Sequence, residues 1–177
     1  MSYWFTCFLL YSCLGYCLEK LFARAMRSER QVRKCFLLLP LCPVYGLAMV
    51  AVLLITPPAL PFWIRVVMGA GICTGVEYLV HLFYDKVFRT QFWNYSDLSF
   101  HIRGRVCPHF AIIWGILSTV AVDYFHPILS AVATAAPPAM VYALWLLFAV
   151  DCVFTAALLL RSHDTELLSL STLLSQQ

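Results

Sequence analysis

The sequence predicts an all-α protein, a polytopic transmembrane helical bundle with about five membrane-spanning helices in a single domain. Hydrophobic residues fill 62% of the 177 positions and charged residues only 12%, about half the charged share of a soluble globular domain. Apolar runs of about 20 residues, the length that a membrane helix needs, recur between proline-containing links. This composition excludes a disordered chain, and the polar residues are too few to cover a soluble domain.

Five apolar runs define the expected helices, and each would measure about 30–35 Å as an α-helix. They occupy residues 3–22, 36–55, 62–84, 106–125 and 139–160. The second run is the least regular, because Pro40 and Pro43 would kink the helix or delay its start. The first run lacks a basic leading region and a small-residue cleavage site, so we expect it to be retained rather than removed as a signal peptide.

Proline-containing links separate most of these runs. Residues 56–61 form a tight link, His126-Pro127 is expected to end the fourth helix, and Pro137-Pro138 precedes the fifth. The one long polar connection covers residues 85–105. Residues 162–177 form a polar tail, which we expect in the cytoplasm.

Basic residues predict the orientation in the membrane. Ten of the twelve Lys and Arg residues lie in two stretches, 20–34 and 86–105, whereas the links 56–61 and 126–138 contain none. The positive-inside rule places the basic loops in the cytoplasm. We therefore expect a protein of the cell inner membrane with its N-terminus outside the cell and its C-terminus in the cytoplasm. Each basic stretch adjoins an apolar run, so we expect membrane lipids and not nucleic acid as its partner.

Ionisable residues within the runs predict a shared polar site. The expected topology places five of them in the cytoplasmic half of the membrane and a sixth, Asp123, in the other half. A charge that faces lipid costs about 2.5–3.5 kcal/mol on insertion scales, so we expect the five to converge on a cavity and to act as binding groups. The five are Glu19, Glu77, His81, His109 and Asp151.

Two arginines, Arg103 and Arg105, lie at the expected mouth of that cavity. They would anchor the fourth helix at the inner interface, and they could also bind an anionic headgroup or a substrate phosphate. Asp151 is the deepest of the charges. It is either a charged member of the site or a neutral acid that hydrogen-bonds a neighbouring helix.

Glu77 and His81 are four residues apart and share one helix face. This spacing suits a carboxylate that orients an imidazole in a proton relay, but a purely structural polar network explains it as well. No other His or Cys pair has metal-ligand spacing, and the eight cysteines contain no C-x-x-C pair. We therefore expect no metal, no other cofactor and no disulfide framework.

Aromatic and polar residues alternate in the polar connection around residues 88–100. Trp93, Tyr95 and Asp97 lie between two basic clusters. Aromatic residues at this place are typical of the headgroup level. The sharper interpretation is a segment that docks a soluble partner or the chain's own bundle.

Several short blocks stand out in the sequence: Glu77-Tyr78, Asp85-Lys86, Trp93-Asn94-Tyr95-Ser96-Asp97, Gly104-Arg105-Val106-Cys107 and Trp114-Gly115. Tyr45-Gly46, in the proline-containing stretch after Leu39, and the Gly15…Glu19 pattern of the first run accompany them. Together they resemble the bacterial membrane family described as putative ABC-transporter type IV. The resemblance covers about residues 8–120 and implies a permease, without implying a substrate or a catalytic residue. The family tends to have Asp where this chain has Asn94 and Asn where it has His101.

Three functions remain open from the sequence. A permease-like subunit would need a separate ATPase or other energy source, because the chain has no P-loop motif, and a homo-oligomer or partner chain, because five helices are few for a pathway. An intramembrane enzyme acting on a lipid-linked substrate would use Glu77, His81, Arg103 and Arg105. No Ser-His-Asp or H-E-x-x-H pattern supports it, so a non-enzymatic role is favoured. The third function is a scaffold or sensor subunit.

Overall fold

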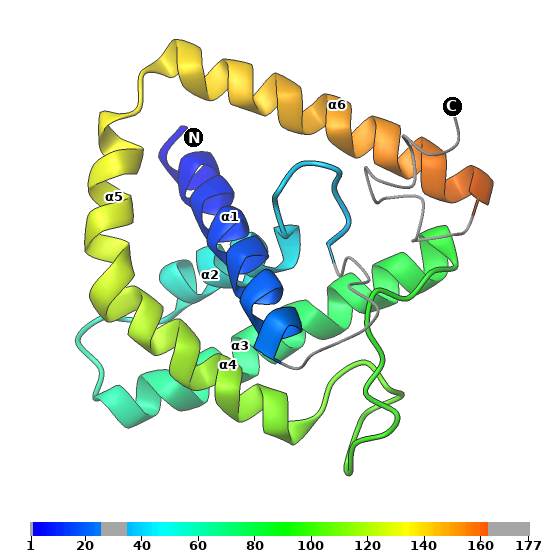
Figure 1. Cartoon of the computed structure of the whole chain (residues 1–177). Coiled ribbons are helices and arrows are strands. Elements are labelled where there is room, and N and C mark those ends of the chain that lie inside the picture. Colours follow the sequence, from blue (N-terminus) through cyan, green and yellow to red (C-terminus); the bar gives the residue numbers. More distant parts are fainter. Residues whose placement is uncertain (1, 26–34, 163–177) are drawn as a thin grey trace.

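The protein is described by a computed structural model over residues 2–25 and 35–162. The described residues form α-helices and two short π-helices without a β-strand (Figure 1). The elements are α1 (Ser2–Ala25), α2 (Pro43–Ile55), α3 (Phe62–Phe83), η1 (Tyr84–Phe88), α4 (Pro108–Val120), η2 (Ala121–Phe125), α5 (His126–Ala135) and α6 (Pro138–Ser162). The basic stretch 26–34 and the tail 163–177 lie outside the described residues, so their predicted placement stays a prediction.

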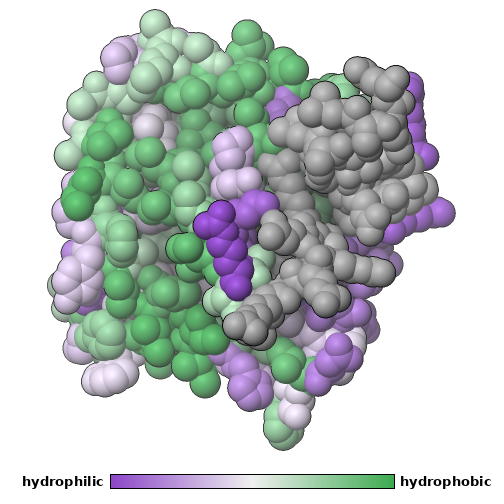
Figure 2. Space-filling view, in the orientation of Figure 1, coloured by the Kyte–Doolittle hydropathy of each residue, from purple (hydrophilic) through white to green (hydrophobic). Residues whose placement is uncertain are grey.

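Four helical segments of the described chain are long and apolar enough to cross a membrane. They are Ser2–Ala25, Phe62–Phe88, Pro108–Ala135 and Pro138–Arg161. The predicted all-α, membrane-spanning class is therefore confirmed. Many large apolar side chains are exposed, and hydrophobic residues cover much of the visible face (Figure 2), which is the arrangement expected where the surrounding solvent is lipid.

The second predicted helix is shorter than expected. It was predicted over 36–55, but α2 begins at Pro43 and has 13 residues, or about 20 Å. Proline at the first helical position has no N–H to continue a helix backwards, and it keeps the preceding residue out of the α region. Cys42 accordingly has an extended backbone (φ −117°, ψ 91°), and residues 35–42 are not helical.

The prediction that His126-Pro127 ends the fourth helix is wrong. The helix continues from α4 through η2 into α5 and ends at Ala135, and the link to α6 is reduced to residues 136–137. Proline inside an α-helix clashes with the carbonyl four residues earlier. Here the π turn Ala121–Phe125 precedes Pro127, which sits in the first turn of α5. The wider turn changes the hydrogen-bond register just where the proline would otherwise break it.

Small residues let the helices approach closely in two places. A Cβ atom added to Gly15 of α1 would overlap the ring of Tyr45 in α2, and one added to Gly115 of α4 would overlap the carbonyl of Val66 and the side chain of Ala70 in α3. Close approach of this kind is the usual source of packing energy between helices in a membrane. It fixes α1 against α2 and α3 against α4.

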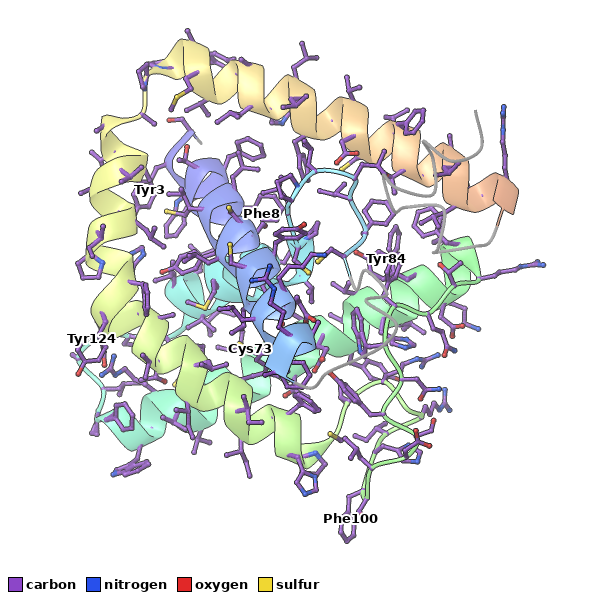
Figure 3. All side chains as sticks on the ribbon, viewed as in Figure 1. Tyr3, Phe8, Cys73, Tyr84, Phe100 and Tyr124 are labelled. Carbon is purple, nitrogen blue, oxygen red and sulfur yellow. The ribbon has the colours of Figure 1, made fainter. Side chains whose placement is uncertain are left out.

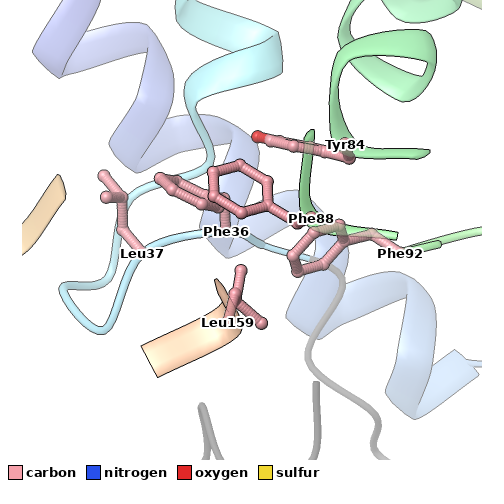
Figure 4. Packing of buried hydrophobic residues seen from close by; sticks show 6 residues of the cluster. All are labelled: Phe36, Leu37, Tyr84, Phe88, Phe92 and Leu159. Atoms are coloured by element: carbon pink, nitrogen blue, oxygen red, sulfur yellow. The ribbon is translucent and has the colours of Figure 1, made fainter. Parts of the chain in front are cut away.

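Aromatic packing closes the end of the bundle at which α3 ends. Phe36 of the non-helical segment stacks on Tyr84 with ring centroids 5.3 Å apart, and Tyr84 contacts Phe92 at 4.7 Å. Leu159 of α6 is fully buried in the same cluster (Figure 4). We call this end the loop end, because the long connection 89–107 lies there. A second cluster in the middle of the bundle contains Ala48, Val52 and Cys73.

Candidate functional site: a buried network of carboxylates and aromatic side chains

Glu77 lies at the centre of a buried polar network near the loop end. The residue is only 7% exposed, although α3 is otherwise strongly apolar. Tyr95 donates its hydroxyl hydrogen to Glu77 Oε1 at 2.8 Å, and the indole Nε1 of Trp114 donates to Oε2 at 3.1 Å. Both carboxylate oxygens therefore have donors inside the protein, and the prediction that Glu77 points into the bundle interior is confirmed.

A second carboxylate, Glu19 of α1, is joined to this network through aromatic rings. Tyr45 donates its hydroxyl hydrogen to Glu19 Oε1 at 2.7 Å. The ring of Tyr45 meets Trp114 edge-on with centroids 5.5 Å apart, and Phe110 stacks on Tyr95 at 4.7 Å. Residues from α1, α2, α3, α4 and the connecting loop thus meet in one place.

One turn further along α3, His81 begins a second group of contacts. Its Nε2 atom lies 3.1 Å from the carbonyl oxygen of Trp93, and the Trp93 indole donates to the carbonyl of Arg105 at 3.0 Å. The Arg105 guanidinium in turn donates to Asp85 at 2.7 Å and to the Tyr78 hydroxyl at 3.3 Å. His81 and Arg105 are both buried, and Arg105 also lies 5.4 Å from the Tyr78 ring centroid, a cation–π contact.

The loop 89–107 folds back on itself and carries Trp93 and Tyr95 into the bundle. The backbone N–H of Tyr95 donates to the carbonyl of Gly104 at 2.8 Å, and that of Ile102 to the carbonyl of Val106 at 2.9 Å. Gly104 has φ +69°, and a Cβ atom there would lie 2.5 Å from Asn94 Oδ1. Only glycine satisfies both conditions without strain.

The side-chain oxygen of Asn94 holds the turn at the start of this loop. It accepts hydrogen bonds from the backbone N–H and the hydroxyl of Ser96, at 2.9 and 2.6 Å. An Asp at this position would supply the same acceptor oxygen. The change from Asp to Asn relative to the family pattern therefore keeps the turn.

The network keeps Tyr95 in its neutral form. Burial, followed by the nearby Glu77 carboxylate, raises the pKa of Tyr95 well above its usual range. A neutral phenol is a hydrogen donor, whereas a phenolate is not. Tyr95 therefore stays a donor to Glu77 at any physiological pH.

The three other predicted site residues have different surroundings. Asp151 is buried in α6 and accepts the backbone N–H groups of Leu38 and Leu39 at 3.2 and 2.9 Å. His109 and Arg103 are exposed. Glu19 and Glu77 thus belong to one network, and His81 and Arg105 belong to the neighbouring group of contacts. Asp151 binds the backbone of the non-helical segment 35–42 instead. Convergence of the predicted residues on a shared cavity stays a prediction.

The predicted partner-docking residues are divided between the interior and the surface. Trp93 and Tyr95 contact the chain's own helices, as described above, while Asp97 is exposed. At the tip of the loop, Phe100 is 85% exposed and points away from the helices (Figure 3). Docking to the chain's own bundle thus accounts for the two aromatics, and docking of a separate partner stays a prediction.

Four residues of the network were not among the predicted site residues. Tyr78, Asp85 and Trp114 did occur in the blocks that carry the family resemblance, and Asp85 is one turn from His81 on the same helix face. Tyr45 also lies in a stretch that resembles the family, but nothing in the sequence marked its side chain as a partner of a carboxylate. No group of three or more His, Cys, Asp or Glu side chains in the described part of the chain is arranged to hold a metal ion.

The apolar helices of crossing length, packed around one buried and one partly buried carboxylate, define a multi-pass α-helical membrane protein. Comparison with known families agrees. The chain belongs to the family described as Putative ABC-transporter type IV, whose model matches residues 6–156. The match confirms the resemblance seen in the sequence and extends it into α6. No curated protein and no solved structure matches the chain.

Proposed function

We propose that the protein is a permease-like subunit of a transport system. The observation that carries the proposal is the pairing of Glu19 and Glu77 through Tyr45, Trp114 and Tyr95 inside a bundle of membrane-crossing length. Ionisable groups at such positions are costly and usually mark the path of an ion or substrate. The family, which is ABC-transporter related, points to the same class.

The contacts of Glu77 would couple the binding of an ion or substrate inside the bundle to the position of the loop 89–107. Its two oxygens hold one donor from the loop, Tyr95, and one from α4, Trp114. A proton or a cationic substrate group arriving at Glu77 competes with both donors. Release of Tyr95 would then loosen the loop 89–107 from the helices. Binding at Glu77 inside the bundle would thus change the position of this loop at the end of the bundle.

The energy source would be a separate chain. The sequence contains no G-x-x-x-x-G-K-[ST] motif, so we propose a separate ATPase or another subunit, and a homo-oligomer or partner chain that completes the pathway. The enzymatic alternative has less support, because Arg105, one of its two expected phosphate ligands, is already engaged by Asp85 and Tyr78.

The proposal is tested by purifying the tagged chain from its native membrane in mild detergent. We expect an ATPase subunit to co-purify and its ATP hydrolysis to change when the chain is removed from the complex. A complex without any nucleotide-hydrolysing or ion-coupled subunit, combined with turnover of lipid by the chain alone, would contradict the proposal and favour the enzyme.

The proposed orientation in the inner membrane is testable by cysteine accessibility. A cysteine introduced at Arg30 should be protected from an impermeant thiol reagent in intact cells, because ten Lys and Arg residues lie in two alternate stretches. A cysteine in place of Ala59, in the link without basic residues, is the matched control and should react. Reaction at position 30 from outside would reverse the orientation.

The loop is expected to be held by its two inward-facing aromatics. Replacing Trp93 and Tyr95 together by Ala removes the bonds to the Arg105 carbonyl and to Glu77 and should lower stability by roughly 2–4 kcal/mol, since each leaves buried groups unpaired. The measurement is the apparent Tm of the purified protein, with capture of partner subunits as the second readout.

Phe100→Ala is the control for that double variant. Phe100 lies on the same loop but is exposed, so its replacement should leave the Tm unchanged. Loss of partner capture in Phe100→Ala at an unchanged Tm would assign docking to the loop tip. An unchanged Tm and unchanged capture in the double variant would contradict both roles of Trp93 and Tyr95.

A further inference from the structure

A small cavity lies at the end of the bundle opposite to the loop end. It is bounded by the end of α2, the start of α3 and the junction of α4, η2 and α5, and its volume is about 190 Å³. Thr56, Arg65 and His126 are among the residues that line it. A space of this size holds roughly six water molecules at about 30 Å³ each, or one small solute.

Each of these three lining residues has a buried polar atom without a hydrogen-bond partner among the described residues. The atoms are Thr56 Oγ1, Arg65 Nε and His126 Nδ1. Buried polar groups in proteins nearly always have partners. Three such atoms in the wall of one cavity indicate that a molecule in the cavity supplies their hydrogen-bond partners. The Thr56 hydroxyl can turn toward such a molecule by rotation about the Cα–Cβ bond.

The chemistry of these groups defines what the cavity would bind. Arg65 Nε can only donate, and a neutral His126 donates from Nδ1 when its Nε2 accepts from the Tyr3 hydroxyl, 3.5 Å away. The ligand must therefore present an acceptor oxygen. Asp123 already neutralises Arg65, since Nη2 donates to Oδ2 at 2.9 Å, so the site has little net charge with which to attract an ion.

The remaining wall is mostly apolar, and its one further hydroxyl, that of Thr119, already donates to the carbonyl of Gly115. Val52 and Leu53 of α2 and Val122 of η2 line the cavity, and Val52 and Val122 also pack in the central cluster with Cys73. Trp114, which binds Glu77, packs against this same cluster. The apolar cluster therefore borders both the cavity and the carboxylate network.

We infer that this cavity is a binding site for a small, uncharged solute with a carbonyl oxygen and a short aliphatic body, such as a carboxamide. The carbonyl accepts from Arg65 Nε and Thr56, and the aliphatic part packs on Val52 and Val122. This site goes beyond the proposed transport function and does not depend on Glu77.

Butyramide is the probe for this site, and saturation-transfer NMR on the protein in lipid nanodiscs is the measurement. We expect saturable binding with a Kd on the order of millimolar, because so few atoms limit the affinity, and none in empty nanodiscs. Thr56→Val should weaken binding roughly two- to tenfold, the effect of one hydrogen bond. Thr74→Val is the matched control, since Thr74 also has a buried, unpartnered hydroxyl but lies outside the cavity lining, and it should bind as wild type.

Butyrate, the charged analogue of nearly the same shape, tests the assignment to an uncharged ligand and should bind more weakly than butyramide. Tighter binding of butyrate, no binding of butyramide above the empty nanodisc, or equal loss in Thr56→Val and Thr74→Val would each overturn the inference. Glu77→Gln should retain butyramide binding, so failure of the transport proposal and failure of this site are distinguishable.

Discussion

Replacing Asp151 by Ala should destabilise the protein by about 3 kcal/mol, because it removes the acceptor of three buried or partly buried hydrogen-bond donors, and each buried donor left without an acceptor costs about 1–3 kcal/mol. The donors are the backbone N–H groups of Leu38 and Leu39 and the hydroxyl of Thr155, all within 3.3 Å of the carboxylate. For a chain of this size the expected decrease in apparent Tm is roughly 6–12 °C, measurable by thermal unfolding of the purified protein.

Two further variants make this prediction specific. Asp151→Asn keeps one acceptor oxygen and should fall between wild type and Asp151→Ala. Asp97→Ala removes an exposed carboxylate and should change stability by less than about 0.5 kcal/mol. An Asp151→Ala protein with the wild-type Tm would show that the segment 35–42 does not depend on this carboxylate.

Replacing Glu77 by Gln should reduce transport-coupled activity at least about tenfold, as expected when the charged member of an ion or substrate path is removed. The amide keeps the shape and one acceptor oxygen. Its NH₂ group must then face either the Trp114 indole or the Tyr95 hydroxyl, both of which are donors to Glu77. We expect an accompanying loss of stability of about 1–3 kcal/mol, measured as Tm next to the activity.

Glu19→Gln is the matched comparison. Glu19 is only partly buried, and its bond from Tyr45 needs a single acceptor, which the amide oxygen supplies. Its Tm should therefore stay near that of wild type. If Glu77→Gln and Glu19→Gln both kept full activity, the network would have only a structural role and the transport proposal would lose its main support.

Hydrophobicity and charge placement predicted the helical class and the inward direction of Glu77, because both follow from the cost of exposing polar groups to lipid. They did not predict the continuous helix through Pro127, since a π turn has no signature in the apolar pattern. They also missed Tyr45 and Trp114 as partners of the carboxylates. Those contacts join residues far apart in the chain, and apolar patterning carries no information on which aromatic ring meets which acid.

Asp151 illustrates how one misplaced boundary changes a functional interpretation. The prediction treated residues 36–42 as the start of a helix, which left the carboxylate at residue 151 available for the shared site. The prolines at positions 40 and 43 instead accompany a non-helical segment. The N–H groups of Leu38 and Leu39 in this segment take Asp151 as their acceptor.

The same arrangement has a consequence for biogenesis. A ribosome delivers the chain to the membrane from its N-terminus, and Asp151 follows Leu38 by 113 residues. The backbone N–H groups of residues 38 and 39 therefore receive this acceptor only after α6 has been synthesised. During synthesis the segment 35–42 must remain where water or another protein can satisfy it, since unpaired N–H groups are not tolerated in hydrocarbon. Insertion of α6 is then the step after which this segment can adopt its final position against Asp151. A chain that ends before residue 151 should be degraded by quality-control proteases.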